Sequence, residues 1–390
     1  MDSYDAVIAG GAVMGASLAF WLTKMQPGIR VLVAERDPSF THAATALSVA
    51  SIRQQFSTPT NVAISRFGIG FIKDFAARIG QPEAGSLGLV ENGYLFLARS
   101  ADGAATLTEM AAMQRSLGAV TEILTPTGVQ ALFDWMDVGD VVAASYGARD
   151  EGWFDNMGLL NGFRMAAKAQ GATFLTDEVT GLVLEGGRVA AARLAKAGEI
   201  RCGAFANAAG TRASVIAGMA GLALPVEPRK RTVFVIDAPN ARHPDAPLLI
   251  DGSYYLRPER NHWITATVPE DDKACDVNDY EPELHLFEDA IWPALYARAP
   301  GFDAVKVVRH WVGHYDYNAF DQNALLGPLP MVPNLYFMNG FSGHGLQQSP
   351  AVGRGVAEHI LTGGWQSLDL SDLSVTRLLA GRRVLETEIV

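Results

Sequence analysis

The sequence predicts an α/β protein: a doubly wound, Rossmann-like domain interleaved with a substrate domain built on an antiparallel sheet. Three observations predict it. A strand–glycine turn–helix unit opens the chain, a similar unit lies near its end, and a strand-rich block with alternating hydrophobicity lies between them. At 390 residues the chain is also too long for one compact core, which favours two lobes.

The first unit starts with a short apolar strand at 5–9, continues through the turn 10–15 and forms an apolar helix to about residue 23. A second strand at 30–34 ends in Glu35. This order is typical of dinucleotide binding, because amides at the helix start bind pyrophosphate and a carboxylate about twenty residues later accepts ribose hydroxyls. The residues expected at this end are Gly10, Gly11, Ala12, Met14, Gly15 and Glu35.

Ala12 departs from the usual motif, which has a second glycine there. Alanine is the least costly replacement, so we expect a small shift of the phosphates and retained binding. The motif does not distinguish FAD from NAD. Glu35 argues against NADP, because a carboxylate repels the 2′-phosphate.

The middle of the chain contains several further elements. Helices are expected at 61–77, 103–117 and 161–170, a hairpin at 179–194, and strands at 91–99, 201–209, 231–237, 253–256 and 263–268. No linker or repeat separates them, so we expect interleaved lobes. The nucleotide domain is expected to take 1–85, 150–220 and 320–390, and the substrate domain 86–149 and 221–319.

The second unit has a strand at 334–338, a glycine turn at 340–345 and a helix at about 346–361. Two helix N-termini can therefore meet one long cofactor, at its pyrophosphate end and at its ring end. An NAD-dependent dehydrogenase does not need the second unit.

Composition excludes several classes of function. A net charge of −11 argues against a nucleic-acid partner, and no apolar run approaches the ~20 residues of a membrane span. Two cysteines cannot form a disulfide framework, so we expect a cytoplasmic protein. His310 and His314 have the i, i+4 spacing of a helical metal site, but they are expected on or beside a strand, which removes the usual metal geometry.

Several segments together resemble the D-amino-acid oxidase-like (DAO) superfamily of FAD oxidoreductases, which includes sarcosine oxidase and glycine oxidase. They are VIAGGAVMGAS (7–17), VLVAERD (31–37), SIRQQF (51–56), NAAG (207–210), YYLRP (254–258) and GFSGHGLQQSPAVGRGVAEHILTG (340–363). PRKRTVFV (228–235) and GHYDYNAFDQN (313–323) are similar to a branch with a mitochondrial FAD oxidoreductase domain protein linked to complex I assembly, and bacterial iminodiacetate oxidase is a further similarity.

The resemblance implies hydride transfer to FAD from a small secondary amine or amino acid, such as sarcosine or iminodiacetate, giving an imine that hydrolyses. Arg53 matches an arginine that binds the substrate carboxylate, and Tyr255 a tyrosine over the substrate pocket. Gln347 stands where sarcosine oxidase has a lysine partner for that arginine, which predicts a weaker hold on the carboxylate.

Other charged residues are less specific. Arg257 and one of Lys230 and Arg231 are expected to add positive charge to the pocket or to the flavin pyrimidine. Strand alternation turns only one of the pair inward and does not show which. Several inward cations would suit a dicarboxylate. His344 is expected to contact flavin or substrate, or to bond only within its loop.

The resemblance also bears on the cofactor and the acceptor. The cysteine that attaches flavin in some relatives is replaced by Gly313 or His314, which predicts non-covalent FAD. The lysine thought to activate oxygen is absent near Ile264 and Thr265, so the electron acceptor can be oxygen or another carrier. Further FAD contacts are expected from Arg36, Thr45, Ser51, Val179, Ala209, Gly210, Gly340, Gly343, His344, Gly345, Leu346 and Gln347.

Two other functions stay open at this point. An FAD-binding scaffold or assembly factor with little turnover fits the loss of the usual lysines, and a large exposed apolar patch would support it. An NAD-dependent dehydrogenase is excluded if the purified protein is yellow.

Overall fold

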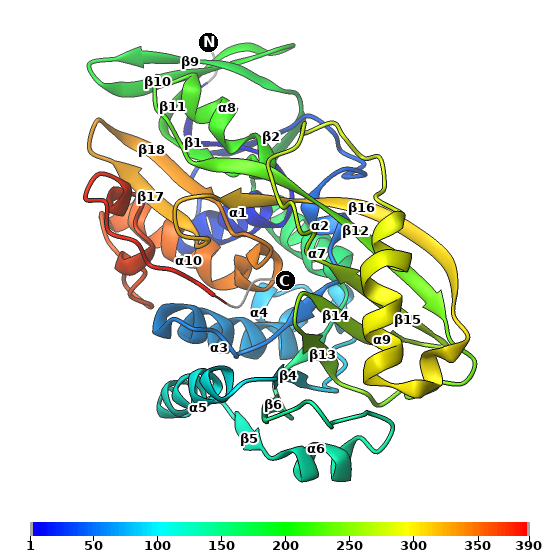
Figure 1. Ribbon diagram of the computed structural model, residues 1–390. Helices are drawn as coiled ribbons and strands as arrows, with labels where there is room; N and C mark the ends of the chain where they lie inside the picture. Colours follow the sequence, from blue (N-terminus) through cyan, green and yellow to red (C-terminus); the bar gives the residue numbers. More distant parts are fainter. Residues whose placement is uncertain (1–2, 388–390) are drawn as a thin grey trace.

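Two eight-stranded sheets build the two lobes of the protein, which is described over residues 3–387 of a computed structural model. In Figure 1 the first sheet lies at the upper left and the second at the lower right. The first sheet takes strands from 3–35, 173–207 and 325–339, and the second from 94–147 and 226–318. The chain therefore passes between the lobes repeatedly.

The first sheet has the order β17-β18-β11-β1-β2-β8, with β10 and β9 continuing from β11. β18, β11, β1, β2 and β8 are parallel neighbours, and the pairs with β17, β10 and β9 are antiparallel. The strands are β1 (Ser3–Ala9), β2 (Val31–Glu35), β8 (Thr173–Thr176), β9 (Val179–Glu185), β10 (Arg188–Leu194), β11 (Gly198–Asn207), β17 (Leu325–Leu329) and β18 (Val332–Asn339).

Both faces of this sheet are covered, as the short apolar strands require. Ala6 and Ile8 of β1 pack with the helices on one face, whereas Val7 and Ala9 pack against the β9–β10 hairpin and α8 (Ala213–Gly218) on the other. Successive side chains of a strand point to opposite faces, so a continuous apolar run serves both cores.

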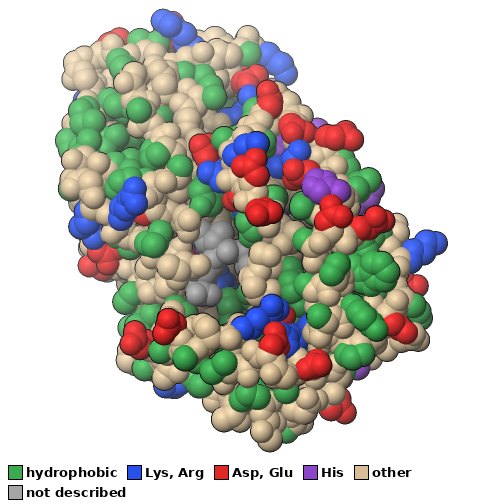
Figure 2. All heavy atoms as spheres, viewed as in Figure 1, with side chains coloured by type: hydrophobic (Ala, Val, Ile, Leu, Met, Phe, Trp, Pro, Cys, Tyr) green, Lys and Arg blue, Asp and Glu red, His purple; other side chains and the backbone are tan. Residues whose placement is uncertain are grey.

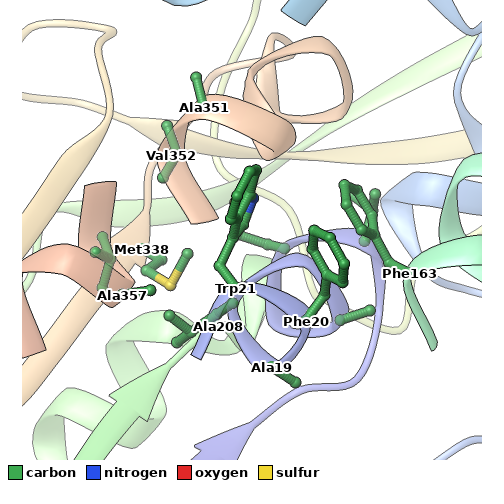
Figure 3. Packing of buried hydrophobic residues seen from close by; sticks show 14 of the residues in the cluster. Ala19, Phe20, Trp21, Phe163, Ala208, Met338, Ala351, Val352 and Ala357 are labelled. Atoms are coloured by element: carbon green, nitrogen blue, oxygen red, sulfur yellow. The ribbon is translucent and has the colours of Figure 1, made fainter. Parts of the chain in front are cut away.

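The helical face is centred on α1 (Val13–Met25), which lies between α10 (Gly345–Thr362) and α7 (Asn156–Ala169). Ser17 Oγ donates to the Ser349 carbonyl at 2.7 Å, and a Cβ on Gly353 would lie 2.2 Å from Ser17 Oγ. Figure 3 shows Trp21 pointing toward the segment with Ala351 and Val352, and Phe20 beside Phe163. The two helices of the glycine-turn units therefore touch directly.

The second sheet has the order β16-β12-β15-β14-β13-β4-β6-β5. Its pairs are antiparallel except β4–β13, which is parallel, so the antiparallel sheet expected from the strands at 231–268 is confirmed. The strands are β4 (Tyr94–Ala98), β5 (Glu122–Leu124), β6 (Ala143–Gly147), β12 (Val226–Asp237), β13 (Leu248–Asp251), β14 (Tyr254–Glu259), β15 (His262–Thr267) and β16 (Lys306–Asn318).

The remaining elements differ from the sequence-based expectations in places. The helix expected at 61–77 is broken at Asp74, whose φ of −106° and ψ of 26° are not helical. The other helices are α2 (Ala44–Leu47), α3 (Pro59–Lys73), α4 (Phe75–Ile79), α5 (Ala101–Ser116), α6 (Pro126–Leu132) and α9 (Trp292–Arg298), and β3 (Ser51–Ile52) pairs with β7 (Gly152–Trp153). The elements that the sequence did not predict are β3, β5, β6, β7, β8, β13, β17, α2, α6, α8 and α9.

The distribution of surface charge and the length of the helices bear on which partners the protein can bind. On the face in Figure 2, basic side chains are interspersed with acidic ones and form no single basic patch. Within residues 3–387, no helix has the length and apolar character needed to cross a membrane. His310 and His314 both lie on β16.

A fully buried ion pair fixes the segment after α10. Arg377 Nε and Nη2 donate to the two carboxylate oxygens of Asp321 at 2.7 and 2.9 Å, and both side chains are inaccessible to solvent. Asp321 also accepts the Val384 amide at 2.9 Å. Removing one partner would leave a buried charge without compensation.

Asp321→Ala should therefore lower the free energy of unfolding by about 3–5 kcal/mol, measured by urea denaturation. The matched control is Asp372→Ala, which breaks an exposed pair with Arg382 (3.1 Å) and should cost less than about 1 kcal/mol. Equal losses for the two variants would contradict the assignment.

Candidate active site and cofactor cavity

A long cavity extends from the carboxyl ends of β1 and β2 to the face of the second sheet. Its first end is lined by Ala9, Gly10 and Glu35, and its other end by residues of β12, β13, β14 and β16 together with the turn before α10. Ligands of doubly wound sheets bind at the carboxyl edge of the strands, so this position is expected for a nucleotide.

Glycines shape the first end of the cavity. Gly10 has a φ of +98°, and a Cβ on Gly15 would lie 1.9 Å from the Gly10 carbonyl oxygen. The N-cap residue of α1, Ala12, makes no side-chain capping bond, and Thr45 Oγ1 accepts the Val13 amide at 3.3 Å. The turn therefore packs directly on the helix, and the amides that follow Val13 in the first turn can bind phosphate oxygens.

Glu35 is fixed beside this turn. Its carboxylate accepts the Gly11 amide at 2.7 Å and the Asp37 amide at 2.8 Å. A Cβ on Gly11 would lie 2.9 Å from the Glu35 Cβ, so the glycine allows this approach. Ala12 has a φ of −69°, which any residue adopts, and its methyl group lines the cavity without backbone strain.

The start of α10, which has no side-chain cap, lies at the other end of the cavity. α10 begins at Gly345, and the His344 side chain makes no capping bond. Gly343 has a φ of +96°, and a Cβ there would lie 2.8 Å from the Tyr315 ring. Asp316 holds the turn by accepting the Gly340 and Phe341 amides at 2.8 and 3.3 Å, and burial raises the pKa of its carboxyl to about 6.

Arg53 lies in the cavity wall and is 3% exposed. Its Nη1 donates to the Gln55 carbonyl at 2.9 Å, and its Nη2 lies 2.9 Å from His344 Nε2. Gln347 Oε1 accepts the Arg53 amide at 2.9 Å. The structure thus brings Arg53, His344 and Gln347 together from positions almost 300 residues apart in the chain.

Three tyrosines line the same part of the cavity: Tyr94, Tyr255 and Tyr315. Burial raises the pKa of Tyr94 to about 12 and raises the pKa values of Tyr255 and Tyr315 as well. All three hydroxyls therefore stay protonated near neutral pH and can donate hydrogen bonds. Tyr94 and Tyr315 were not predicted as site residues, although Tyr315 lies within the GHYDYNAFDQN segment.

The remaining cations separate into inward and outward groups. Arg231 lines the cavity below the Tyr315 ring and bonds both oxygens of Asp272 at 2.8 and 2.9 Å, whereas Lys230 pairs with Asp279 at 2.9 Å and does not line the cavity. Arg231 is thus the inward member of the pair.

Arg257 is expected to add positive charge to the pocket, but it is not among the residues that line the cavity. It is on the same strand face as Tyr255 but two residues farther along. There its guanidinium bonds Glu259 and the Val49 carbonyl and stacks on Trp153.

Most of the other predicted contacts lie in the wall of the cavity. Gly11, Gly15 and Gly340 lie behind the wall and support it. The predicted residues in the wall are Gly10, Ala12, Met14, Glu35, Arg36, Thr45, Ser51, Arg53, Val179, Ala209, Gly210, Tyr255, Gly343, His344, Gly345, Leu346 and Gln347.

The structure also shows where the residues lie that stand in place of the flavin-binding cysteine and the lysine of some relatives. Gly313 and His314 line the cavity, and burial lowers the pKa of His314, whose Nε2 lies 2.7 Å from the Asp279 carbonyl. Ile264 and Thr265 are buried within β15, and Thr265 Oγ1 donates to the Tyr255 carbonyl at 2.7 Å.

These features fit FAD. A carboxylate stands at the ribose position, one helix start faces the expected pyrophosphate, and a second one faces the end of the cavity near Arg53. A dinucleotide with a large ring system needs both ends of such a cavity.

Comparison with known proteins agrees with this fit. Residues 5–359 match the family described as FAD dependent oxidoreductase (DAO). FAD-dependent oxidoreductase domain-containing protein 1 from Xenopus laevis is 38% identical, covering 99% of this chain and 85% of the relative, and the Bos taurus protein is 39% identical, covering 98% and 86%. Sarcosine oxidase subunit beta from Rhizobium meliloti is 25% identical over 93% of this chain and 85% of its own.

Solved structures share the fold. L-proline dehydrogenase from P. horikoshii superposes with a TM-score of 0.86 at 25% identity, covering 98% of this chain and all of its own. Glycine oxidase from Geobacillus kaustophilus has a TM-score of 0.81 at 22% identity, covering 97% and 99%. The protein therefore belongs to the DAO family of FAD-dependent oxidoreductases.

Proposed function

We propose that this oxidoreductase acts on the CH–NH bond of a small amino acid whose nitrogen is a secondary amine, an N-substituted glycine such as sarcosine. The observation that carries the proposal is the buried Arg53 guanidinium in the cavity wall, beside the uncapped start of α10. A guanidinium fork matches a carboxylate, and a site with such a group suits an amino acid better than a simple amine.

FAD, when bound, supplies a two-electron acceptor for the hydride that leaves the carbon beside the nitrogen. The side chains position the substrate. Arg53 binds its carboxylate, and the neutral Tyr255 hydroxyl donates a hydrogen bond to it. The positive charge of Arg53 disfavours a protonated amine, so the nitrogen binds with its lone pair free, and the resulting imine hydrolyses in water.

The α10 start has an electrostatic role in this proposal. Its first amides face the cavity end near Arg53, where negative charge develops when the cofactor accepts a hydride. A helix N-terminus carries roughly half a positive elementary charge. Preorganised donors of this kind stabilise developing charge without reorganisation.

Arg231 bears on the choice between one carboxylate and two. It is the inward cation, but Asp272 already occupies both ends of its guanidinium. This arrangement favours a monocarboxylate such as sarcosine over iminodiacetate. Proline is a further candidate, because its nitrogen is also a secondary amine.

The FAD scaffold is less favoured. Arg53 and Tyr255 line the same cavity and present donors inside it, which a protein-binding scaffold does not require. The electron acceptor is oxygen or another carrier, such as a quinone or an electron-transfer flavoprotein.

The direct test is anaerobic mixing of the FAD-loaded protein with sarcosine, glycine, iminodiacetate, L-proline, D-proline and D-alanine. We expect sarcosine or another N-substituted amino acid to bleach the visible flavin absorbance. Readmitting air then shows whether oxygen is the acceptor. Lack of bleaching with every compound would favour the scaffold.

Arg53→Met should raise KM for the bleaching substrate at least about tenfold, because a charged hydrogen-bonding partner of the carboxylate is lost. The rate of flavin reduction at saturation should change less. Arg257→Met removes an equally buried arginine outside the cavity wall. It should leave KM within about twofold; a similar rise in both variants would contradict the assigned roles.

Gly15→Ala should prevent FAD retention, because its Cβ would lie 1.9 Å from the Gly10 carbonyl oxygen and displace the pyrophosphate turn. The ratio of flavin to protein absorbance after purification measures this loss. Gly70→Ala is the control, since a Cβ there meets nothing within 4 Å. Normal flavin content in Gly15→Ala would refute the expected geometry.

A further inference from the structure

A buried acid outside the cavity wall, Glu151, contacts the segment that carries Arg53. It is 1% exposed and lies just before β7, in the connection from β6. A Cβ on Gly147 would lie 2.2 Å from Glu151 Oε2, so glycine at the end of β6 makes room for the carboxylate.

Three N–H donors of the Arg53 segment converge on this carboxylate. Oε1 accepts the amides of Gln54 and Gln55 at 2.6 and 3.2 Å, and Oε2 accepts Gln55 Nε2 at 2.8 Å. Burial raises the pKa of Glu151 to about 8, and the bonds from Gln55 and Gln54 and the charge of Arg53 oppose that rise. Both carboxylate oxygens of Glu151 therefore accept hydrogen bonds from the Arg53 segment.

Gln55 connects this acid to both the second sheet and Arg53. Its side-chain amide donates to the Tyr94 carbonyl of β4 at 3.2 Å, and its Oε1 accepts Ser145 Oγ of β6 at 2.6 Å. Its main-chain carbonyl accepts Arg53 Nη1 at 2.9 Å. Arg53 Nη1 therefore bonds the carbonyl of a residue whose main-chain amide is held by Glu151 and whose side chain is held by Glu151, β4 and β6.

We propose that Glu151 is a positioning residue for substrate binding: through Gln54 and Gln55 it fixes the Arg53 guanidinium in the orientation that binds the substrate carboxylate. This inference rests on the proposed role of Arg53. It adds that the second sheet sets carboxylate affinity through a residue that touches neither substrate nor cofactor.

Glu151→Gln tests this link with little change of volume. In one orientation, the oxygen of the introduced side-chain amide faces the main-chain amides of Gln54 and Gln55, and its NH₂ group faces the side-chain NH₂ of Gln55. In the flipped orientation, the NH₂ group of the introduced side chain faces the two main-chain amides. Either orientation opposes donor to donor in a buried site. The Gln55 peptide should then shift, and Arg53 with it.

The readout is the dissociation constant of a ligand that the FAD-loaded protein binds but does not oxidise. Binding is monitored by the change that it causes in the flavin absorbance spectrum. The probes are (methylthio)acetate, in which a thioether replaces the amine, and the uncharged (methylthio)acetamide. Glu151→Gln should raise the dissociation constant of the acetate about tenfold, which one opposed buried donor can cost. The amide constant should change less than about twofold.

The matched control is Glu91→Gln. Glu91 lies near the same turn, accepts the Asp150 amide at 3.0 Å and pairs with Lys73 at 2.8 Å, but it is exposed and does not contact the Arg53 segment. This control is the same Glu-to-Gln replacement and should leave both dissociation constants unchanged.

A rescue variant separates positioning from general stability. Gln55→Glu combined with Glu151→Gln restores one donor–acceptor pair between the two positions, although it loses the donation to Tyr94. It should recover at least about threefold of the tenfold loss. If Glu151→Gln does not fold, Ser145→Ala serves as a milder test, because it removes only the hydroxyl bonded to Gln55. It should raise the dissociation constant of the acetate about two- to threefold.

The outcomes decide between the two proposals. Wild-type affinity for (methylthio)acetate in Glu151→Gln, even with reduced stability to urea, would overturn the positioning role, as would unchanged binding in Ser145→Ala. Failure of the wild-type protein to prefer the acetate over the amide would instead refute the carboxylate role of Arg53, and the inference with it.

Discussion

The close crossing of α1 and α10 is the constraint on which the site depends. Ser17 and Gly353 meet where any side chain on Gly353 would overlap the serine hydroxyl, and the hydroxyl bonds the α10 backbone. This contact holds two helices from opposite ends of the chain with their first turns on one cavity. The dipoles of both helices then act on the same cofactor, one at each end.

The second constraint is a buried polar junction between the lobes. The Arg53 segment leaves the first lobe and is held by Glu151, Ser145 and the Tyr94 carbonyl, all connected with the second sheet. Buried polar groups are costly unless every donor and acceptor is satisfied, so such a junction tolerates few arrangements. It can therefore give the guanidinium one defined direction, which a loop open to solvent would not.

The sequence predicted the parts of the site that rest on local signals. The glycine turns at 10–15 and 340–345, their strands and their helices follow from local periodicity and backbone geometry, and the structure has them at those places. Local alternation was less informative for the cations. It left Lys230 and Arg231 undecided, and it could not show that Arg257, on the face of Tyr255, turns its guanidinium to Glu259. Glu151 had no sequence signal, because its partners are almost 100 residues away.

The sequence by itself therefore determined the fold class, the dinucleotide-binding unit and the two glycine turns, since strand and helix periods and the steric needs of glycine act over a few neighbouring residues. Only the tertiary structure decided which side chains line the cavity. Arg231 rather than Lys230 is inward, Tyr94 and Tyr315 join Tyr255, and Arg53 meets His344 and Gln347. These choices depend on contacts between sheets and helices far apart in the chain, for which no local pattern exists.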